Sequence, residues 1–162
     1  MAQIASKITP FLWYADKAEE AARFYVSVFP NSSIDSCTAM NAESPSGPPG
    51  SVEVVEFTLD GLRFVAMKAG PMDNFNHPIS FVVGCKDQAE VDHYWDKLGQ
   101  GGSYEQCGWL KDKYGLAWQI TPTILTEMQK DKDRARAKRV TEAMLKMKKL
   151  DIATLKRAYD GN

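Results

Sequence analysis

The chain has little cysteine, little histidine and no long apolar run. Its 162 residues include three cysteines and two histidines. An odd number of widely spaced cysteines does not suit a disulfide framework and predicts reduced thiols, as in the cytoplasm. No apolar run approaches the roughly 20 residues of a membrane-spanning helix, and the N-terminal MAQIASKITP lacks the basic flank and apolar core of a signal peptide. These absences predict a cytoplasmic protein with no membrane partner.

The residues that are present are those of one ordinary globular domain, but their charge is unevenly distributed. Hydrophobic residues make up 44% and charged residues 25% of the chain. Up to Met128 there are 9 Lys and Arg against 16 Asp and Glu, whereas from Gln129 onward there are 11 against 5. We therefore expect the basic tail to attract the acidic body, within one chain or between subunits. Nucleic-acid binding by the tail is the less expected alternative, because basic residues on an amphipathic helix are usually only solvated.

A strand followed by an amphipathic helix occurs twice. ITPFLWY (8–14) precedes a helix predicted over 16–29, and PISFVVG (78–84) precedes one over 87–98. Asp16 and Asp87 stand at the expected helix starts, each with a glutamate three residues on, which is the capping-box pattern. The apolar faces have the same spacing in both helices: Ala21, Phe24, Tyr25 and Val28 in the first, and Val91, Tyr94, Trp95 and Leu98 in the second.

Three strand-like segments follow each helix, so the repeated unit is βαβββ. The segments are SSIDSCTAM, SVEVVEFTL and LRFVAMKA, then SYEQC, GWLKD and LAWQITP. Asp60-Gly61 predicts a two-residue hairpin, and NAESPSGPPG (41–50) predicts a loop inside the first unit. One such unit leaves a sheet face bare, so two must pack together to close a core. The sequence predicts an α+β fold in which units at about 7–70 and 77–123 form a paired domain, residues 1–123.

Residues 124–162 predict a helical extension. Val140, Ala143, Met144 and Met147 form an apolar stripe. Asp151 can cap a last helix that carries Ile152, Leu155 and Tyr159. We expect this extension to pack on the body or on a partner subunit.

Two βαβββ units in tandem resemble the vicinal oxygen chelate superfamily, which has the glyoxalase/bleomycin-resistance fold. The segments ITPFLWYADKAEEAARFYVSVFPNSSI, GPPGSVEVVEF through Asp60-Gly61, and QCGWLKDKYGLAWQITP are similar to its PhnB-like branch, labelled 3-demethylubiquinone-9 3-methyltransferase-like. The resemblance implies curved mixed sheets that enclose a cavity for a small-molecule ligand, in a homodimer.

The enzymes of this superfamily hold a divalent metal through His and Glu side chains on the first and last strands of each unit. The resemblance places these ligand positions at Pro10 (or Thr9), Val65, Ser80 and Gln119. Pro and Val offer no ligand and an amide is a poor substitute for a carboxylate, while His77 and His93 fall elsewhere. The expected function is therefore small-molecule binding without a metal or another cofactor. The alternatives are a metal-dependent lyase, isomerase or dioxygenase, and a dimer scaffold whose tail recruits a partner.

The candidate ligand-binding residues are aromatic or polar, and the resemblance places them on cavity-lining strands. They are Phe11, Trp13, Phe64, Cys107, Trp109, Trp118 and Gln119. Side-chain alternation predicts that half or more of the aromatic residues are plain core. Cys107 is expected to be inert, and Gln119 resembles a former metal ligand whose amide now bonds a ligand or a neighbouring strand.

The sequence shows no recognisable catalytic group and no methyl-donor loop. The glycine run at 99–102 follows a helix and enters a strand, whereas a nucleotide or methyl-donor loop follows a strand and opens a helix. We therefore do not expect the methyltransferase label to describe an activity.

Overall fold

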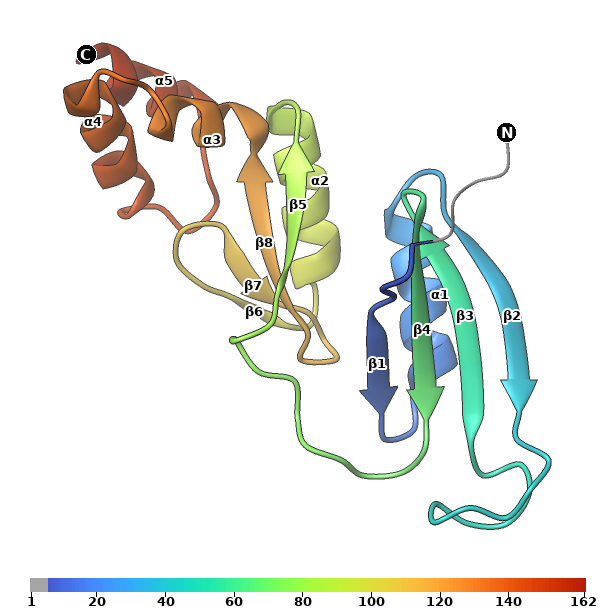
Figure 1. The fold of residues 1–162 in the computed structure, drawn as a ribbon. Coiled ribbons are helices and arrows are strands. Elements are labelled where there is room, and N and C mark those ends of the chain that lie inside the picture. Colours follow the sequence, from blue (N-terminus) through green and yellow to red (C-terminus); the bar gives the residue numbers. More distant parts are fainter. Residues whose placement is uncertain (1–5) are drawn as a thin grey trace. The chain divides into compact units, whose positions relative to one another are not determined.

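The computed structural model describes residues 6–162, which form two compact units, the first ending at Asp73 and the second spanning 74–162 (Figure 1). The first five residues, part of the N-terminal stretch in which no signal peptide is expected, lie outside the described residues. Each unit has a four-stranded mixed sheet, in the order β1-β4-β3-β2 or β5-β8-β7-β6. In both sheets the first strand pairs in parallel with the last strand, and the other pairs are antiparallel. The predicted α+β fold is confirmed.

The first unit follows the predicted order of strand, helix and three strands. Its elements are β1 (Phe11–Tyr14), α1 (Ala18–Val28), β2 (Ser33–Ala39), β3 (Glu53–Leu59) and β4 (Leu62–Lys68). The predicted hairpin joins β3 to β4, because Asp60 and Gly61 both have positive φ, 45° and 81°, as a two-residue type I′ turn requires. The predicted 41–50 loop lies between β2 and β3.

Helix α1 covers one face of the first sheet, and the core lies between them. Phe57 stacks on Phe64 with ring centroids 5.4 Å apart, and Tyr25 of α1 lies 6.4 Å from Phe57. Burying a side chain of this size contributes about 1.5–3 kcal/mol. The buried residues of α1 are Ala18, Ala21, Ala22, Tyr25 and Val28, so the predicted face is correct except that Phe24 is only half-buried. The predicted Asp16 cap is wrong, since α1 begins after Lys17 without a side-chain cap.

The second unit repeats this arrangement and then continues into the tail. Its elements are β5 (Phe81–Cys85), α2 (Gln88–Gly99), β6 (Ser103–Tyr104), β7 (Trp109–Lys111) and β8 (Ala117–Pro122). The predicted cap is confirmed, because the Asp87 carboxylate accepts the Glu90 N–H at 2.9 Å. All four predicted core residues of α2 are buried: Val91, Tyr94, Trp95 and Leu98.

The tail consists of three short helices with a core of their own. They are α3 (Thr123–Gln129), α4 (Arg134–Met144) and α5 (Ile152–Asp160). Val140 of the predicted stripe is buried with Leu125, Met128, Leu150 and Leu155, and the other three stripe residues, Ala143, Met144 and Met147, pack against this cluster. The Asp151 cap is confirmed, since its carboxylate accepts the Thr154 N–H at 2.7 Å. Among residues 6–162 no helix is long and apolar enough to cross a membrane.

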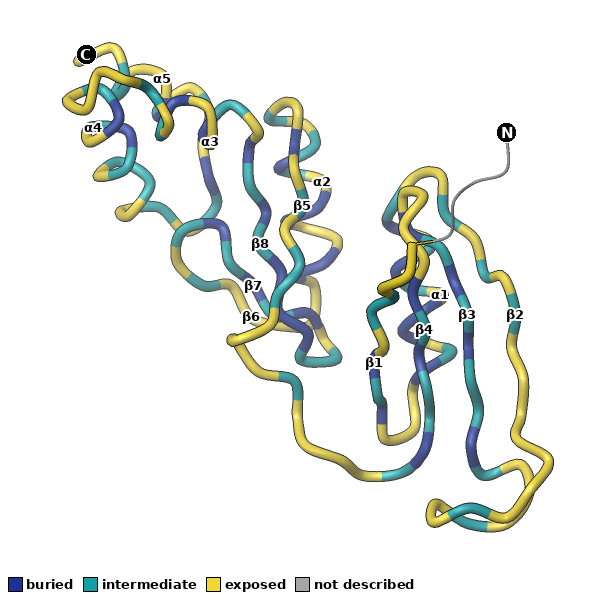
Figure 2. The backbone as a smooth tube through the Cα atoms, viewed as in Figure 1, coloured by how far each residue is buried: buried dark blue, intermediate teal, exposed yellow. Residues whose placement is uncertain are grey.

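The face of each sheet that points away from its own helix is here called the open face. Burial alternates along the strands, and the exposed and half-buried residues mark this face (Figure 2). On the first sheet it carries Phe11, 55% exposed, and on the second it carries Val82, 62% exposed. Each open face therefore carries an exposed apolar side chain.

Candidate functional site

The Lys-Asp-Lys-Tyr-Gly turn between β7 and β8 is organised by Asp112, a structural role that the sequence did not indicate. Asp112 is only 2% exposed. Its carboxylate accepts the Tyr114 N–H at 2.8 Å, the Leu116 N–H at 3.1 Å and the Trp118 indole Nε1–H at 2.8 Å. Buried carboxylates need such donors, because an unpaired buried charge is costly. The motif therefore fixes the start of β8 and the orientation of Trp118.

Two of the candidate residues, Phe64 and Trp118, lie on the helix-covered faces of their sheets. Each is 3% exposed. Phe64 packs on Phe57, and Trp118 contacts Phe81 with ring centroids 5.6 Å apart. Phe64 is therefore a core residue of the first unit and Trp118 a core residue of the second. Side-chain alternation along a strand predicts this position for part of the aromatic candidates.

Gln119 lies on the open face of the second sheet, because it is the neighbour of Trp118 in the same strand. It stands between Val82 of β5 and Trp109 of β7. Its Nε2 donates to the Ser80 Oγ at 2.9 Å. This bond uses one of the four hydrogen-bonding capacities of the amide.

Trp109 extends this polar group toward a hydrogen-bonded pair, His77 and Glu105, that no sequence pattern indicated. The His77 ring lies 6.1 Å from the Trp109 ring, and His77 Nε2 is 2.7 Å from a Glu105 carboxylate oxygen. We call these five residues, Ser80, Gln119, Trp109, His77 and Glu105, the Gln119 row. His77 and Glu105 are 28 positions apart, so no local pattern could have paired them.

Cys107 lies in the turn that leads into β7. It is half-buried and has φ of 59°, and the next residue, Gly108, has φ of 82°. Both amides donate to carbonyls of the tail, Cys107 to Met147 at 2.8 Å and Gly108 to Lys148 at 2.8 Å. Cys107 thus forms part of the turn that precedes Trp109.

Phe11 and Trp13 lie on the open face of the first sheet. Phe11 pairs with Val65 of β4, and the half-buried Trp13 donates its indole N–H to the Gly70 carbonyl at 2.9 Å. Within the units, the structure brings together Phe11 and Trp13 in the first and Trp109 and Gln119 in the second.

The positions where the resemblance places metal ligands do not fit a divalent cation. Pro10 and Val65 have no donor side chain, although the Pro10 carbonyl accepts the Val65 N–H at 3.0 Å. Ser80 and Gln119 bond each other and are neutral. Protein sites for divalent cations are built mainly on carboxylates, imidazoles or thiolates, and these four positions carry none of them.

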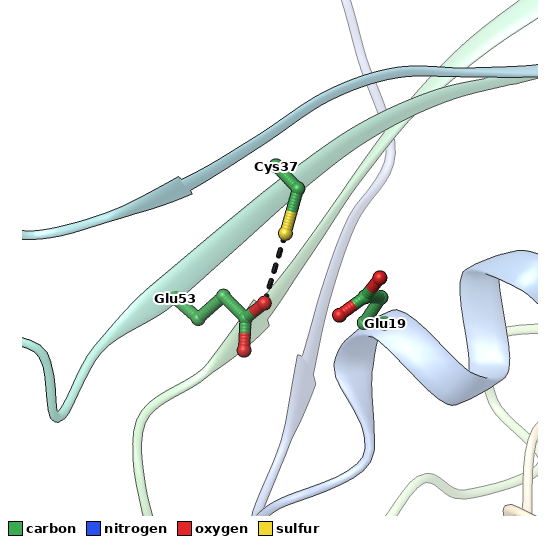
Figure 3. A group of neighbouring side chains, drawn as sticks. All are labelled: Glu19, Cys37 and Glu53. Carbon is green, nitrogen blue, oxygen red and sulfur yellow. Dashed lines mark hydrogen bonds between the residues drawn. The ribbon is translucent and has the colours of Figure 1, made fainter.

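A different group in the first unit has suitable ligand types. Glu19, Cys37 and Glu53 bring one ligand atom each within 4.8 Å of one another, at the margin of the helix-covered face (Figure 3). The Cys37 thiol donates to Glu53 at 2.8 Å, and this bond, together with burial, raises the pKa of Cys37 to about 11. Arg23 pairs with Glu19 and Lys68 with Glu53. The group is therefore a thiol–carboxylate pair with its own cations, on a different sheet from the Gln119 row.

The chain is similar to several proteins of known structure. The PhnB protein from Bacillus cereus has 36% identity and a TM-score of 0.63, over 72% of this chain and 99% of its own. Protein PA1353 from Pseudomonas aeruginosa has 20% identity and a TM-score of 0.54, over 70% and 95%. The fosfomycin resistance protein FosX from Mesorhizobium loti has 17% identity and a TM-score of 0.54, over 77% and 97%, and shares the fold. No curated protein matches the chain.

The two βαβββ units and these neighbours define a protein of the vicinal oxygen chelate superfamily. Within it, the family model described as 3-demethylubiquinone-9 3-methyltransferase matches residues 6–121, and the chain belongs to that PhnB-like family. The match ends before the three helices of the tail.

Proposed function

We propose that this chain binds a small organic molecule on the open face of its second sheet, at the Gln119 row, without a catalytic metal. The observation that carries the proposal is the Gln119–Ser80 pair beside Trp109 on a face that α2 does not cover. Among residues 6–162, the Gln119 oxygen and its second N–H make no hydrogen bond to another side chain. An amide held by one bond therefore presents a donor and an acceptor to a ligand.

The chemistry of the row favours a planar or apolar ligand with a polar group. Trp109 offers a ring face for stacking, and Gln119 and Ser80 offer hydrogen bonds beside it. The carboxylate of Glu105 holds His77 near the same ring. Ligand sites are typically apolar with a few placed polar groups of this kind. Phe11 and Trp13 offer apolar surface on the open face of their own, first sheet.

We also propose that residues 1–123 form one paired domain and that the protein is a cytoplasmic homodimer. The exposure of Phe11 and Val82 supports this proposal. Another βαβββ unit, of the same chain or of a second copy, would cover each open face and bury these side chains. The three free cysteines support a reducing compartment. Light scattering should give twice the 18.1 kDa of one chain, and a monomer mass would contradict the dimer.

We do not propose methyl transfer. The glycines at 99–102 begin at the last residue of α2 and lead into β6, with the Gly102 N–H donating to the Gly99 carbonyl at 3.0 Å. A methyl-donor loop opens a helix, so that the helix N–H groups face the ligand. The family description is therefore a family name for this chain and not its proposed activity.

The test is a thermal-shift screen of small molecules followed by titration of variants. For a compound that stabilises the wild type, Gln119→Leu should weaken binding roughly 5- to 10-fold, the value of one hydrogen bond. Trp109→Ala should weaken it by a similar factor, while Gln100→Leu, the same change at an exposed residue after α2, should leave it unchanged. Addition of EDTA should not alter the affinity. Unchanged affinity in both row variants, or loss with EDTA, would refute the proposal.

A further inference from the structure

The turn before Trp109 has a backbone conformation that needs support. Cys107 and Gly108 are consecutive residues with left-handed φ, 59° and 82°. A residue with a Cβ atom disfavours this conformation unless the surroundings hold it there. Strand β7 begins at the next residue, so this turn determines how Trp109 enters the open face.

The tail supplies that support through residues 147–150, the segment between α4 and α5 (Figure 1). The Met147 and Lys148 carbonyls accept the Cys107 and Gly108 amides, both at 2.8 Å. Leu150, which is 1% exposed, packs against Gly108, where an added Cβ would lie 3.1 Å from its Cδ1. The turn is thus bonded and packed by a segment about 40 positions later in the sequence.

Helix α2 holds the 147–150 segment in place. The Gln88 amide donates to the Leu150 carbonyl at 3.2 Å and accepts the Ile152 N–H at 2.9 Å. The Lys149 ammonium pairs with Asp92 at 3.0 Å and with Asp96 at 3.3 Å. These contacts come from the first turn of α2 and its polar face, where Gln88 and Asp92 are half-buried and Asp96 is exposed, so they can be altered without changing a residue of the sheet.

We infer that the 147–150 segment is a positioning element for Trp109, so that docking of the tail on α2 controls the Gln119 row. The expected effect of tail docking on ligand affinity rests on the proposed function. The expected effect of tail docking on the Cys107-Gly108 turn does not. The family match ends at residue 121, so this control comes from a part of the chain outside that match.

The experiment compares hydrogen exchange and indole NMR signals in the full chain. The variant Gln88→Ala/Lys149→Ala removes both attachments of the segment, and Gln100→Ala/Lys148→Ala is the matched control, since these two side chains are exposed. Exchange of the Cys107 and Gly108 amides should become roughly tenfold faster, because two hydrogen bonds and two ion pairs of the segment are lost. The Trp109 indole N–H signal, assigned with Trp109→Phe, should shift. The amides that join β5 to β8 should keep their protection. The single variant Lys149→Arg, which leaves Gln88 unchanged, should keep the ion pairs and the wild-type exchange of the turn.

Two results would overturn the inference. In the first, the Cys107 and Gly108 amides stay within twofold of wild type while the amides of α5 exchange faster. In the second, protection falls uniformly across the second unit, also in the single variants Gln88→Ala and Lys149→Ala. Neither result depends on a ligand, so a failure of the proposed function would be seen separately, as the absence of any stabilising compound.

Discussion

Replacement of Asp112 by alanine should be among the most damaging substitutions in the second unit. Its carboxylate accepts two backbone N–H groups and the Trp118 indole, and it is 2% exposed. A hydrogen bond to a charged group contributes about 1.5–3 kcal/mol. Because water can reach part of the turn once the side chain is gone, we expect Asp112→Ala to lower the free energy of unfolding by about 3–5 kcal/mol.

Urea denaturation followed by tryptophan fluorescence measures this loss. Asp112→Asn keeps one acceptor oxygen and should lose about half as much. Asp73→Ala, at an exposed aspartate, is the control and should stay within about 0.5 kcal/mol of wild type. A double-mutant cycle with Trp118→Phe should give a coupling of about 1–2 kcal/mol. If Asp112→Ala costs less than about 1 kcal/mol, the role assigned to this carboxylate is wrong.

Three further predictions concern other parts of the chain. Gly108→Ala should destabilise the protein by about 2 kcal/mol more than Gly115→Ala in the same denaturation assay. Both glycines have positive φ, but only a Cβ at Gly108 would meet the Ile120 carbonyl oxygen, at 2.6 Å. Equal losses of stability in the two variants would contradict this reasoning. Cys37 is exposed, yet its pKa of about 11 keeps it as a thiol, so Glu53→Gln should speed its alkylation at pH 8 roughly tenfold, and an unchanged rate would refute the pairing. The pKa of Asp92 lies below its usual 3.8 because Gln88 and Lys149 donate to it, and that of Asp151 is lowered by Thr154. Their stabilisation of the tail is therefore complete above about pH 4 and lost as the pH falls through the lowered pKa values; exchange of the α5 amides should accelerate there, and the Asp92→Asn variant should lose part of that dependence.

Periodicity along the chain sufficed for the elements and their order. Val91, Tyr94, Trp95 and Leu98 recur at helical spacing, and all four are buried in α2. Asp60-Gly61 specified its hairpin by local backbone preference alone. The Asp16 cap failed because Lys17 is the residue before the first helical one, and sequence patterns locate helix ends only to within a residue or two.

The site was less predictable because its contacts join distant residues. Alternation requires Trp118 and Gln119 to face opposite sides of β8, but the sequence does not say which side α2 covers. The Gln119–Ser80 bond spans 39 positions and the His77–Glu105 pair spans 28. The support of Cys107 by Met147 spans a similar interval and involves only backbone atoms, which leave no residue-type signature.

Native mass spectrometry of the freshly purified protein tests the central claim most directly. The account predicts a bound organic mass in the wild type and in Gln100→Leu, and a clearly lower bound fraction in both Gln119→Leu and Trp109→Ala. A stoichiometric metal ion that disappears in Gln119→Leu, or an organic mass bound by both row variants at the wild-type fraction, would contradict it.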